Sequence, residues 1–321
     1  MKILIAQTIP KIGSDSLKKH YEVLEADRIL PKEELVDLIK DKDALICTPF
    51  HKIDSEILKA GKNLRVISTL SIGFEHIEIE AAGKLGIAVV NVPGLMTQTV
   101  AELVFAHILA LARRVVEADN YIRSGKFQKW DFELMVGTEL KGKTLGIIGF
   151  GSIGRCLVPI AKGFGMRVLY NNHHGEADNF KNDLAVRFAG LEELLRSADF
   201  IVLTVPLTNE TMRLMDYEKF SMMKPSAFLV NASRGPVVKE TDLIRALQEK
   251  KIAGAGLDVY EFEPKISEEL LATNNTVLTP HIGGATTEAR NLSSLKAAQN
   301  VIDILETGEC ENIVNREFLK L

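Results

Sequence analysis

The chain of 321 residues has little cysteine, a single tryptophan and no long apolar segment. Its three cysteines, Cys47, Cys156 and Cys310, lie far apart and show neither a C-x-x-C pair nor metal-ligand spacing, so neither a disulfide framework nor a metal site is predicted. Each is expected to be a small buried apolar residue. No run of about 18 apolar residues occurs, which argues against a membrane-spanning helix. We therefore expect a cytoplasmic protein with reduced cysteines.

The charge balance excludes another class of partner. A net charge of −4 leaves no basic excess for binding nucleic acid, so a small molecule is the expected partner. The hydrophobic fraction of 46% and the charged fraction of 26% are typical of a globular protein, and the length is enough for about two domains. The apolar run in residues 1–7 is too short for a secretory segment and predicts a first strand.

Short apolar segments recur along the chain and are separated by polar, helix-forming stretches such as residues 32–41. This alternation predicts βαβ units and parallel sheets. One series of strands is followed by a second, so two α/β halves stand in tandem. The predicted strands are residues 3–6, 22–24, 44–47, 66–69 and 88–90, then 145–148, 167–170, 200–205, 227–231, 256–259 and 276–278.

A helical pattern lies between the two halves. Apolar positions in residues 97–124 recur at helical spacing and predict one long, largely buried helix. His107 lies inside it and is expected to be a satisfied core or interface histidine and not a ligand. Residues 126–143, which carry Trp130, show no clear periodicity and form either an arm that packs on a partner subunit or a loop folded back on its own domain. A last helix over residues 286–305 is predicted to return to the first domain.

A G-x-G-x-x-G turn, Gly149-Phe150-Gly151-Ser152-Ile153-Gly154, follows the strand at residues 145–148 and precedes a helical pattern. Gly149 permits the tight turn, Gly151 lets the backbone approach a pyrophosphate, and Gly154 lets the helix pack on the strand. Phosphate can then bind at the helix N-terminus. Because both flanking elements are present, we predict a dinucleotide-binding site that includes Ser152 and Ile153.

Three polar residues, Arg234, Glu263 and His281, come at the ends of predicted strands in the second half. Ligands bind at the carboxyl ends of the strands in open α/β sheets. The planar guanidinium of Arg234 suits two-point recognition of a carboxylate and a carbonyl. A histidine paired with a carboxylate is favoured in its protonated form, so His281 beside Glu263 can serve as a general acid. Taken alone, Arg234 also fits a solvated turn and Glu263 a charged loop.

These motifs together resemble the D-isomer-specific 2-hydroxyacid dehydrogenase family, and within it the glyoxylate and hydroxypyruvate reductase group. The resemblance covers nearly the whole chain and includes the segments at residues 71–77, 99–103 and 139–144. It rests on the glycine turn together with Asn231-Ala232-Ser233-Arg234-Gly235-Pro236-Val237-Val238, Leu257-Asp258-Val259-Tyr260-Glu261-Phe262-Glu263-Pro264 and Thr279-Pro280-His281-Ile282-Gly283-Gly284.

The resemblance implies an α/β protein with two doubly wound parallel-sheet domains. A Rossmann cofactor domain, residues 97–287, would be inserted into a flavodoxin-like substrate domain, residues 1–96 plus 288–321. The family's activity implies an NAD(P)-dependent oxidoreductase that reduces a small 2-oxo acid, such as glyoxylate or hydroxypyruvate, to the D-2-hydroxy acid. The substrate would bind in the cleft, and the enzyme would be a homodimer without a metal.

Residue roles are carried over from the family by position. Arg234 would bind the substrate carboxylate and 2-oxo group, His281 would donate the proton to the carbonyl oxygen, and Glu263 would hold and charge the histidine. The backbone amides of Ile72 and Gly73 would hold the carboxylate. The cofactor contacts expected beyond the glycine turn are Asn171, Asn172, Pro206, Ala232, Ser233, Asp258 at the nicotinamide carboxamide, and Gly283.

The second strand of the cofactor half ends without the acid that is usual there. In Rossmann sites an Asp or Glu about 20 residues beyond the glycines bonds the ribose 2′-hydroxyl of NAD. Here the strand ends in Asn171, Asn172, His173 and His174. The missing charge removes repulsion against a 2′-phosphate, and these side chains can donate hydrogen bonds to it. We predict a preference for NADPH, with NADH use left open because no arginine is present.

The sequence leaves the substrate open among glyoxylate, hydroxypyruvate, 2-ketogluconate and pyruvate. Phe50 either narrows the pocket toward small acids or belongs to the core, and Trp130 or Met135 from a neighbouring subunit would add a wall. Two other functions fit the same fold: a dinucleotide-sensing interaction protein, like the C-terminal-binding protein corepressors, and phosphite dehydrogenase. The chain lacks the long disordered or basic extensions that would suggest a scaffold.

Overall fold

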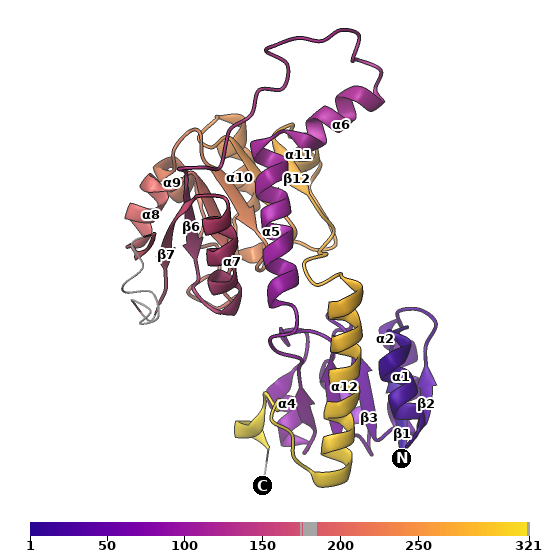
Figure 1. Ribbon diagram of the computed structural model, residues 1–321. Coiled ribbons are helices and arrows are strands. Elements are labelled where there is room, and N and C mark those ends of the chain that lie inside the picture. The colour runs from indigo at the N-terminus through magenta and orange to yellow at the C-terminus, as the bar shows by residue number, and fades with distance from the viewer. Residues whose placement is uncertain (174, 176–184, 320–321) are drawn as a thin grey trace. The chain divides into compact units, whose positions relative to one another are not determined.

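The computed structural model of the chain describes residues 1–173, 175 and 185–319 (Figure 1). The chain divides into two compact units, Met1–Met96 with Ala285–Leu321 and Thr97–Gly284. The first unit is therefore discontinuous, and the chain returns to it at Ala285, slightly earlier than the predicted residue 288. Among the described residues, no helix is both long and apolar enough to cross a membrane.

The first unit is built on a five-stranded sheet in the order β2-β1-β3-β4-β5, with all strands parallel. This is the strand order of flavodoxin-like doubly wound sheets. The strands are β1 (Lys2–Ile5), β2 (Glu22–Glu25), β3 (Ala44–Cys47), β4 (Val66–Thr69) and β5 (Ala88–Val90). The helices are α1 (Lys11–Lys18), α2 (Lys32–Leu38), α3 (Ser55–Ala60), α4 (Ile79–Lys84) and α12 (Thr287–Thr307), with short 3-10 turns η1 (Ile39–Asp41) and η4 (Arg316–Phe318).

Helix α12 belongs to the core of the first unit although it comes near the end of the chain. Thr286 caps its N-terminus by accepting a hydrogen bond from Ala289, and the helix ends at Gly308, whose φ of 78° suits glycine. α12 packs on α1, where a side chain on Gly13 would lie within 2.1 Å of the Ser294 hydroxyl. The predicted return of the C-terminal helix to the first half is confirmed.

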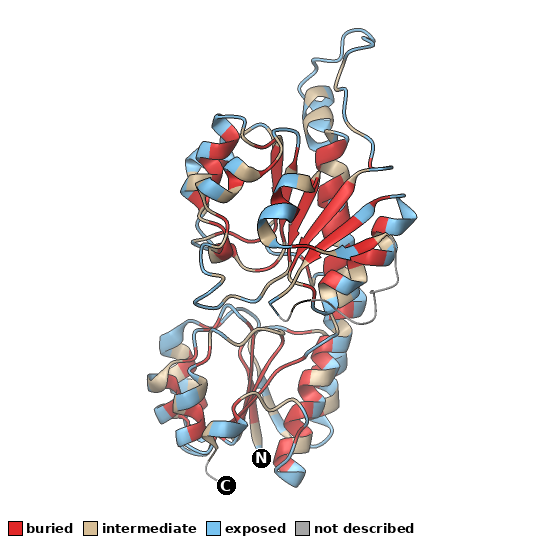
Figure 2. Ribbon diagram, turned by 90° about the vertical axis from the view of Figure 1, so that its left-hand side faces the viewer, coloured by how far each residue is buried: buried red, intermediate tan, exposed pale blue. Residues whose placement is uncertain are grey.

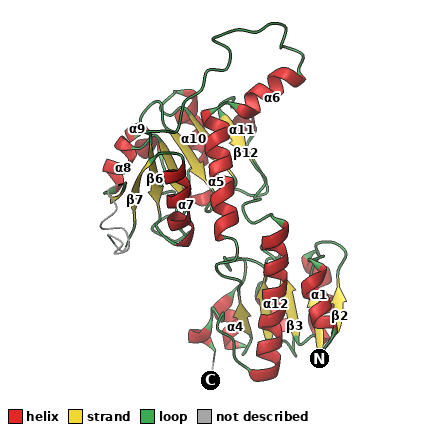
Figure 3. Cartoon of the chain, viewed as in Figure 1, coloured by secondary structure: helices red, strands yellow, loops and turns green. Residues whose placement is uncertain are grey.

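The second unit carries a seven-stranded parallel sheet in the order β12-β11-β10-β9-β6-β7-β8, which is the Rossmann order with an added strand (Figure 3). The strands are β6 (Thr144–Ile148), β7 (Arg167–Asn171), β8 (Val186–Phe188), β9 (Phe200–Leu203), β10 (Phe228–Asn231), β11 (Gly254–Leu257) and β12 (Thr276–Leu278). The helices are α5 (Thr97–Ala112), α6 (Val115–Arg123), α7 (Ser152–Gly163), α8 (Leu191–Ser197), α9 (Tyr217–Met222), α10 (Glu240–Gln248) and α11 (Glu268–Leu271), with the 3-10 turn η3 (Gly235–Val237).

The central strands of this sheet are buried along their whole length, as Figure 2 shows. Parallel sheets have helices on both faces, which explains why their strands appear in the sequence as continuous apolar runs. The predicted fold class, two doubly wound α/β domains of Rossmann and flavodoxin-like order, is confirmed.

One strand, β8, was missed, and the predicted bounds of β9 and β11 differ from the structure by two residues. β8 is a strand of three residues with only one of them buried, too short to give an apolar run. β11 begins at Gly254, earlier than the predicted residue 256, because glycine and alanine give no strand signal. Gly254 cannot carry a side chain, since a Cβ there would lie 2.4 Å from the Asn275 carbonyl.

The prediction of one long buried helix over residues 97–124 was wrong. The helix breaks after Ala112, and Arg114 adopts a left-handed conformation with φ 53°. The backbone N–H of Thr138 donates to the Ala112 carbonyl over 2.8 Å, and Gly137 allows this approach. The new helix α6 has no buried residue. Helical spacing of apolar residues persists across the break, so the pattern alone did not reveal it.

The segment after α6 does not fold back on its own unit. In Figure 1, α6 and the loop that follows it reach away from the sheet of the second unit. Trp130 and Phe132 are 75% and 79% exposed, and their rings contact each other edge to face. Of the two interpretations left open by the sequence, the structure supports a projecting arm.

Candidate active site

The glycine turn lies at the point where the strand order of the second sheet reverses, between β6 and β9. Gly149 has φ 96°, and a side chain there would lie 2.8 Å from the backbone of Thr204 and Val205 at the end of β9. A side chain on Gly154 would lie 2.5 Å from the Gly149 carbonyl. The first and third glycines are therefore required by packing within the protein itself.

Gly151 differs from its two neighbours in the motif. A Cβ built on it has no other atom within 4 Å, so packing within the chain does not require glycine there. Helix α7 begins directly after it, no side chain caps the helix N-terminus, and the first turn carries no acid. Uncapped N–H groups at the positive end of a helix dipole bind phosphate well. The residues present therefore fit the pyrophosphate of a dinucleotide.

The end of β7 carries the asparagines that replace the usual acid. The side-chain nitrogen of Asn171 donates a hydrogen bond to the Ala189 carbonyl over 2.9 Å, which uses one of its two N–H groups. Asn172 follows the strand directly and is half-buried, and His173 is exposed with its Nδ1 3.9 Å from a carboxylate oxygen of Glu210. His174, also predicted here, lies outside the described residues.

The structure brings two of the three predicted catalytic side chains into direct contact. Nδ1 of His281 lies 2.9 Å from Oε2 of Glu263, and the other carboxylate oxygen accepts a hydrogen bond from the backbone N–H of Tyr260. Both side chains stand at the carboxyl end of the sheet, in the loops after β11 and β12. The histidine keeps its second nitrogen, Nε2, for a ligand.

Electrostatics keep the Glu263 carboxylate charged. Burial by itself would raise its pKa. The hydrogen bond with His281, the backbone N–H of Tyr260 and the positive charge of Arg234 outweigh burial and hold the pKa of this carboxyl below its usual range. A charged carboxylate beside an imidazole favours the protonated ring. The pair therefore has the properties of a general acid.

Arg234 is held close to this pair by the backbone. It begins the turn after β10 (Phe228–Asn231), and the Asn231 side chain donates to the Arg234 carbonyl over 3.1 Å. A side chain on the next residue, Gly235, would lie 1.7 Å from the Tyr260 carbonyl, so the turn packs tightly on the loop that carries Glu263. The Arg234 guanidinium donates to the Ser233 carbonyl over 2.9 Å and is half-buried.

Asp258, directly after β11, is buried and holds the loop after β12 that carries His281. Its Oδ1 accepts hydrogen bonds from the Thr279 hydroxyl and the Ile282 N–H, and its Oδ2 accepts one from the Gly283 N–H. These distances lie between 2.6 and 2.8 Å. The side chain is only 2% exposed, and Oδ2 accepts fewer bonds than a carboxylate oxygen can.

In the first unit, the loop after β4 is rigidly tied. The Ser71 hydroxyl donates to the Gly73 carbonyl over 2.6 Å, and the Asn91 side chain donates to the Ile72 carbonyl over 2.8 Å. Within the described residues the backbone N–H groups of Ile72 and Gly73 donate to no partner. Unpaired N–H groups on a fixed loop suit an anion such as a carboxylate.

Known proteins resemble this chain in sequence and in fold. The chain matches the family model described as D-isomer specific 2-hydroxyacid dehydrogenase, NAD binding domain, over residues 105–283. This range includes the glycine turn and the three side chains Arg234, Glu263 and His281. The chain belongs to this family.

Individual relatives agree with the family assignment. The dehydrogenase is 41% identical to a glyoxylate reductase of Pyrococcus furiosus over 326 aligned residues, which cover 100% of this chain and 97% of the relative. It matches the NADPH-dependent glyoxylate/hydroxypyruvate reductase of Sinorhizobium meliloti, solved with NADP and malonate, with a TM-score of 0.85, 26% identity, and coverage of 100% of this chain and 98% of that one. It also matches D-lactate dehydrogenase of Aquifex aeolicus, complexed with NAD and lactic acid, with a TM-score of 0.83, 28% identity, and coverage of 98% and 99%. The protein is an NAD(P)-dependent oxidoreductase.

Phe50 of the dehydrogenase is not a core residue. It is 69% exposed in the loop after β3, so the interpretation of Phe50 as a core residue is wrong. The neighbouring His51 anchors this loop, since its Nε2 donates to the Ala6 carbonyl and its Nδ1 accepts a hydrogen bond from the Thr48 N–H. Burial lowers the pKa of His51, in keeping with a neutral ring. Phe50 is thus presented on a fixed loop at the carboxyl edge of the first sheet.

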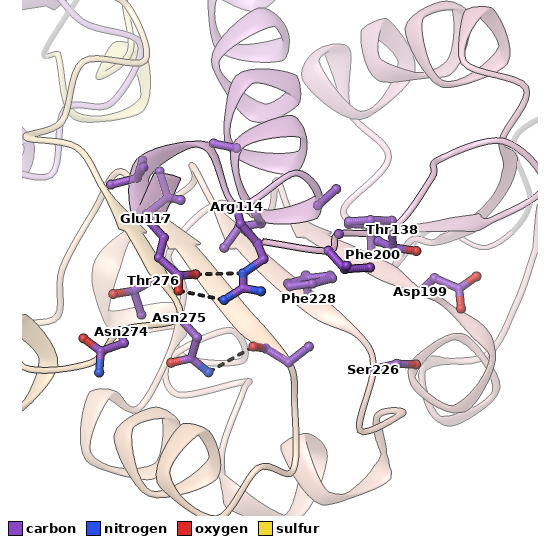
Figure 4. Close-up of a pocket in the computed structure, with 18 of the residues that line it drawn as sticks. Arg114, Glu117, Thr138, Asp199, Phe200, Ser226, Phe228, Asn274, Asn275 and Thr276 are labelled. Atoms are coloured by element: carbon purple, nitrogen blue, oxygen red, sulfur yellow. Dashed lines mark hydrogen bonds and ion pairs between the residues drawn. The ribbon is translucent and has the colours of Figure 1, made fainter. Parts of the chain in front are cut away.

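A cavity of 740 Å³ in the dehydrogenase lies away from these residues (Figure 4). It is lined by Phe200 and Phe228, which begin β9 and β10, and by the ion pair of Arg114 with Glu117. It therefore sits at the amino ends of the strands, opposite the edge where ligands bind in such sheets. Within the described ranges, no group of three or more His, Cys, Asp or Glu lies close enough to hold a metal ion.

Tyr260 belongs to the site but was not singled out from the sequence as a functional residue. Tyr260 supports both loops of the active site, because its N–H donates to Glu263 and its hydroxyl donates to the Thr279 carbonyl over 2.9 Å. Burial and nearby carboxylates raise the pKa of Tyr260 to about 12, so the hydroxyl keeps its proton.

The expectation that His107 is a satisfied core histidine was half right, because it is buried but its Nδ1 has no hydrogen-bond partner of ordinary geometry among the described residues. Of the cysteines, Cys47 and Cys310 are buried as expected, while Cys156 is half-buried.

Proposed function

We propose that the enzyme reduces a small 2-oxo acid of the glyoxylate and hydroxypyruvate kind to the D-2-hydroxy acid. The observation that carries the proposal is the contact between His281 and Glu263 at the same edge of the sheet as the glycine turn. The proposed general acid and the proposed dinucleotide site then lie on the same compact unit. The similarity to glyoxylate reductases over the whole chain favours this function over the corepressor-like and phosphite-oxidising alternatives.

The catalytic roles follow from the chemistry of each side chain. When bound, the reduced nicotinamide supplies a hydride to the carbonyl carbon of the 2-oxo acid. Nε2 of protonated His281 donates the proton that the carbonyl oxygen needs, while Nδ1 stays bonded to Glu263. The guanidinium of Arg234 binds the substrate carboxylate and polarises the carbonyl oxygen through two parallel donors.

Each unit has its own part in the proposal. The second unit, residues 97–284, is the proposed cofactor domain, and the first unit, residues 1–96 plus 285–321, is the proposed substrate domain. The N–H groups of Ile72 and Gly73 hold the substrate carboxylate, which is supported by their lack of partners within the described chain. Phe50 limits the size of the substrate side chain, which is supported by its exposure on a fixed loop.

The cofactor contacts remain those expected from the sequence. Oδ2 of Asp258 accepts a hydrogen bond from the nicotinamide carboxamide, supported by its unused acceptor capacity. The further contacts are Gly149, Gly151, Ser152, Ile153, Gly154, Asn171, Asn172, Pro206, Ala232, Ser233 and Gly283.

We further propose that NADPH is the preferred cofactor. The support is the absence of an acid at the end of β7, which leaves a 2′-phosphate without a repelling charge. The donors proposed for the phosphate are Asn172, His173 and the N–H of Asn171 that is not bonded to Ala189. The Glu210 carboxylate near His173 works against a phosphate, so the margin over NADH is expected to be small.

Steady-state kinetics with both reduced cofactors tests the preference. The wild-type enzyme should show a higher kcat/KM with NADPH, and Asn172→Asp should reverse the order by repelling the 2′-phosphate and accepting from a 2′-hydroxyl. Asn63→Asp, the same change in an exposed turn of the first unit, is the control and should alter neither value. A higher kcat/KM with NADH in the wild-type enzyme contradicts the proposal.

The enzyme is proposed to be a homodimer in which the arm at residues 115–136 packs on a second copy. Support comes from the exposed apolar side chains along it, including Trp130 and Phe132. Sedimentation should show a dimer that the double change Trp130→Ser and Phe132→Ser weakens, and a wild-type monomer contradicts this. The cytoplasmic location stays a prediction from the sequence.

The reaction itself is tested with a panel of 2-oxo acids, following oxidation of NADPH. Glyoxylate and hydroxypyruvate should be the best substrates, ahead of pyruvate and 2-ketogluconate. Oxidation of phosphite with NADP⁺ and no turnover of any 2-oxo acid would point to the phosphite-type alternative. Tight dinucleotide binding with no turnover of either class would point to a sensing protein.

A further inference from the structure

His107 is a buried histidine inside the cofactor unit, on helix α5. α5 packs on β10, β11 and β12, and the His107 side chain is 2% exposed. Its ring lies against Gly256 in β11, where a Cβ would come within 2.8 Å of Nδ1. The ring therefore fills the space left by the missing side chain of Gly256, next to the loops that carry the active-site residues.

The hydrogen bonds of His107 have a definite direction. Its Nε2 lies 3.0 Å from the Thr279 hydroxyl, and that hydroxyl lies 2.6 Å from Oδ1 of Asp258. A hydroxyl has one hydrogen, and it goes to the carboxylate, which can only accept. The same hydroxyl must then accept from His107, so Nε2 carries the hydrogen. The chain of donors runs from the histidine through the threonine to the aspartate.

The remaining ring nitrogen, Nδ1, lies against the Gly256 backbone. It is buried and makes no hydrogen bond of ordinary geometry within the described residues. Burial lowers the pKa of His107, although the nearby Asp258 charge and the Gly256 backbone act to raise it, so the ring is neutral. An unpaired buried polar atom costs stability, and an apolar side chain would avoid that cost. The histidine is therefore not the side chain that stability alone favours at this position.

The aspartate at the end of this chain fixes the backbone around His281. Its carboxylate accepts from the N–H groups of Ile282 and Gly283, and its carbonyl accepts from the N–H of His281 over 2.9 Å. His281 has φ 54°, a left-handed conformation that costs energy for a residue with a side chain. The surrounding hydrogen bonds must hold the residue in this conformation.

We propose that His107 is a positioning residue for the dehydrogenase reaction. Its Nε2–H fixes the Thr279 hydroxyl so that the hydroxyl's hydrogen points at Asp258. Asp258 in turn fixes the backbone of residues 281–283 and with it the direction of the His281 ring. The inference rests on the proposed role of His281 as proton donor.

The test compares His107→Leu with His107→Gln. Leucine fills the space beside Gly256 without a donor, whereas glutamine places an amide N–H near the position of Nε2. His107→Leu should lower kcat about three- to tenfold, the factor that one neutral hydrogen bond is worth, with the KM for NADPH nearly unchanged. Its Tm should equal or exceed the wild-type value because the unpaired nitrogen is gone. His107→Gln should restore most of the kcat.

Thr279→Val tests the middle of the chain. It should lower kcat at least as much as His107→Leu, and the double variant should lose no more than Thr279→Val alone, because both act through one path. Ser293→Ala is the matched control. Ser293, in α12 of the other unit, has the only other buried side-chain atom without a partner among the described residues, and removing it should leave kcat unchanged.

Three results would overturn the inference: a kcat for His107→Leu equal to wild type, a His107→Gln enzyme as slow as His107→Leu, or a loss of kcat matched by a fall in Tm. A failure of the proton-donor role of His281 can be told apart from a failure of the positioning role of His107. If His281→Asn keeps full turnover, the proton-donor role itself is wrong. If His281→Asn is inactive and His107→Leu is fully active, only the positioning role is wrong.

Discussion

The Nδ1 atom of His281 lies 2.9 Å from Oε2 of Glu263. The carboxylate can only accept, so Nδ1 carries a hydrogen in every state in which this bond is made. Nε2 then holds a proton only when the ring is doubly protonated, and this proton is the one available to a carbonyl oxygen. Reduction therefore uses the protonated ring and leaves the neutral ring, with its hydrogen still on Nδ1, as the base for the reverse reaction.

His281→Asn should cut reductive turnover by a factor of about 10² to 10⁴, the usual worth of a general acid. Asparagine tolerates the left-handed backbone that His281 adopts, with φ 54°, so the loop should keep its shape. The measurement is kcat together with the Kd for NADPH from its fluorescence. The Kd should stay near the wild-type value, and unchanged turnover would remove His281 from the chemistry.

Glu263→Gln should remove the acid side of the pH dependence of reduction. Despite burial, the hydrogen bonds with His281 and Tyr260 and the charge of Arg234 hold the pKa of Glu263 below its usual range, so the carboxylate takes up a proton only in the acidic range. Wild-type kcat should therefore fall at acidic pH as Glu263 loses its charge, whereas Glu263→Gln, which cannot titrate, should show a lower kcat without this fall. A Glu263→Gln enzyme with wild-type kcat would show that the carboxylate does not act on the histidine.

Arg234→Lys should lower kcat/KM for 2-oxo acids by about 10- to 150-fold, the range for losing a hydrogen bond to a charged group. Lysine keeps the positive charge but cannot offer two parallel donors to a carboxylate and a carbonyl. The loss should appear in kcat as well as in KM, because the carbonyl oxygen gains charge in the transition state. A change in KM alone would restrict Arg234 to substrate binding.

Gly151→Ala should weaken dinucleotide binding while leaving the protein stable. Its φ of −78° is ordinary for alanine, and the new Cβ would meet no atom of the chain. The methyl group would instead meet the pyrophosphate, so we expect the Kd for NADPH to rise about tenfold, or 1.4 kcal/mol. Calorimetric titration measures the Kd and thermal unfolding measures Tm.

Gly163→Ala is the matched control for that experiment. It also places a methyl group where no atom lies within 4 Å, but at the far end of the same helix. It should leave both Kd and Tm unchanged or raise Tm slightly, because alanine favours the helix. An unchanged Kd in Gly151→Ala would mean that the pyrophosphate does not approach this glycine.

Much of the fold could be predicted because the information is local. Eleven apolar segments coincide with parallel strands to within a residue or two, since strands buried on both faces must be apolar throughout. The glycine turn could also be predicted from the sequence, because its glycines are required by short-range contacts. A side chain on Gly154 would meet the Gly149 carbonyl, and one on Gly149 would meet the end of β9. Arg234, Glu263 and His281 were found because strand ends can be read from the strands before them.

The sequence by itself determined where the strands lie and which residues stand at their carboxyl ends. Only the tertiary structure decided which hydrogen bonds connect these residues to distant segments of the chain. The break of the helix after Ala112 depends on Thr138 from a later segment, and the bond between His107 and Thr279 spans 172 residues of chain. Such contacts carry no periodic signal, because a hydrogen bond depends on where two folded segments meet and not on the spacing of residues within either one.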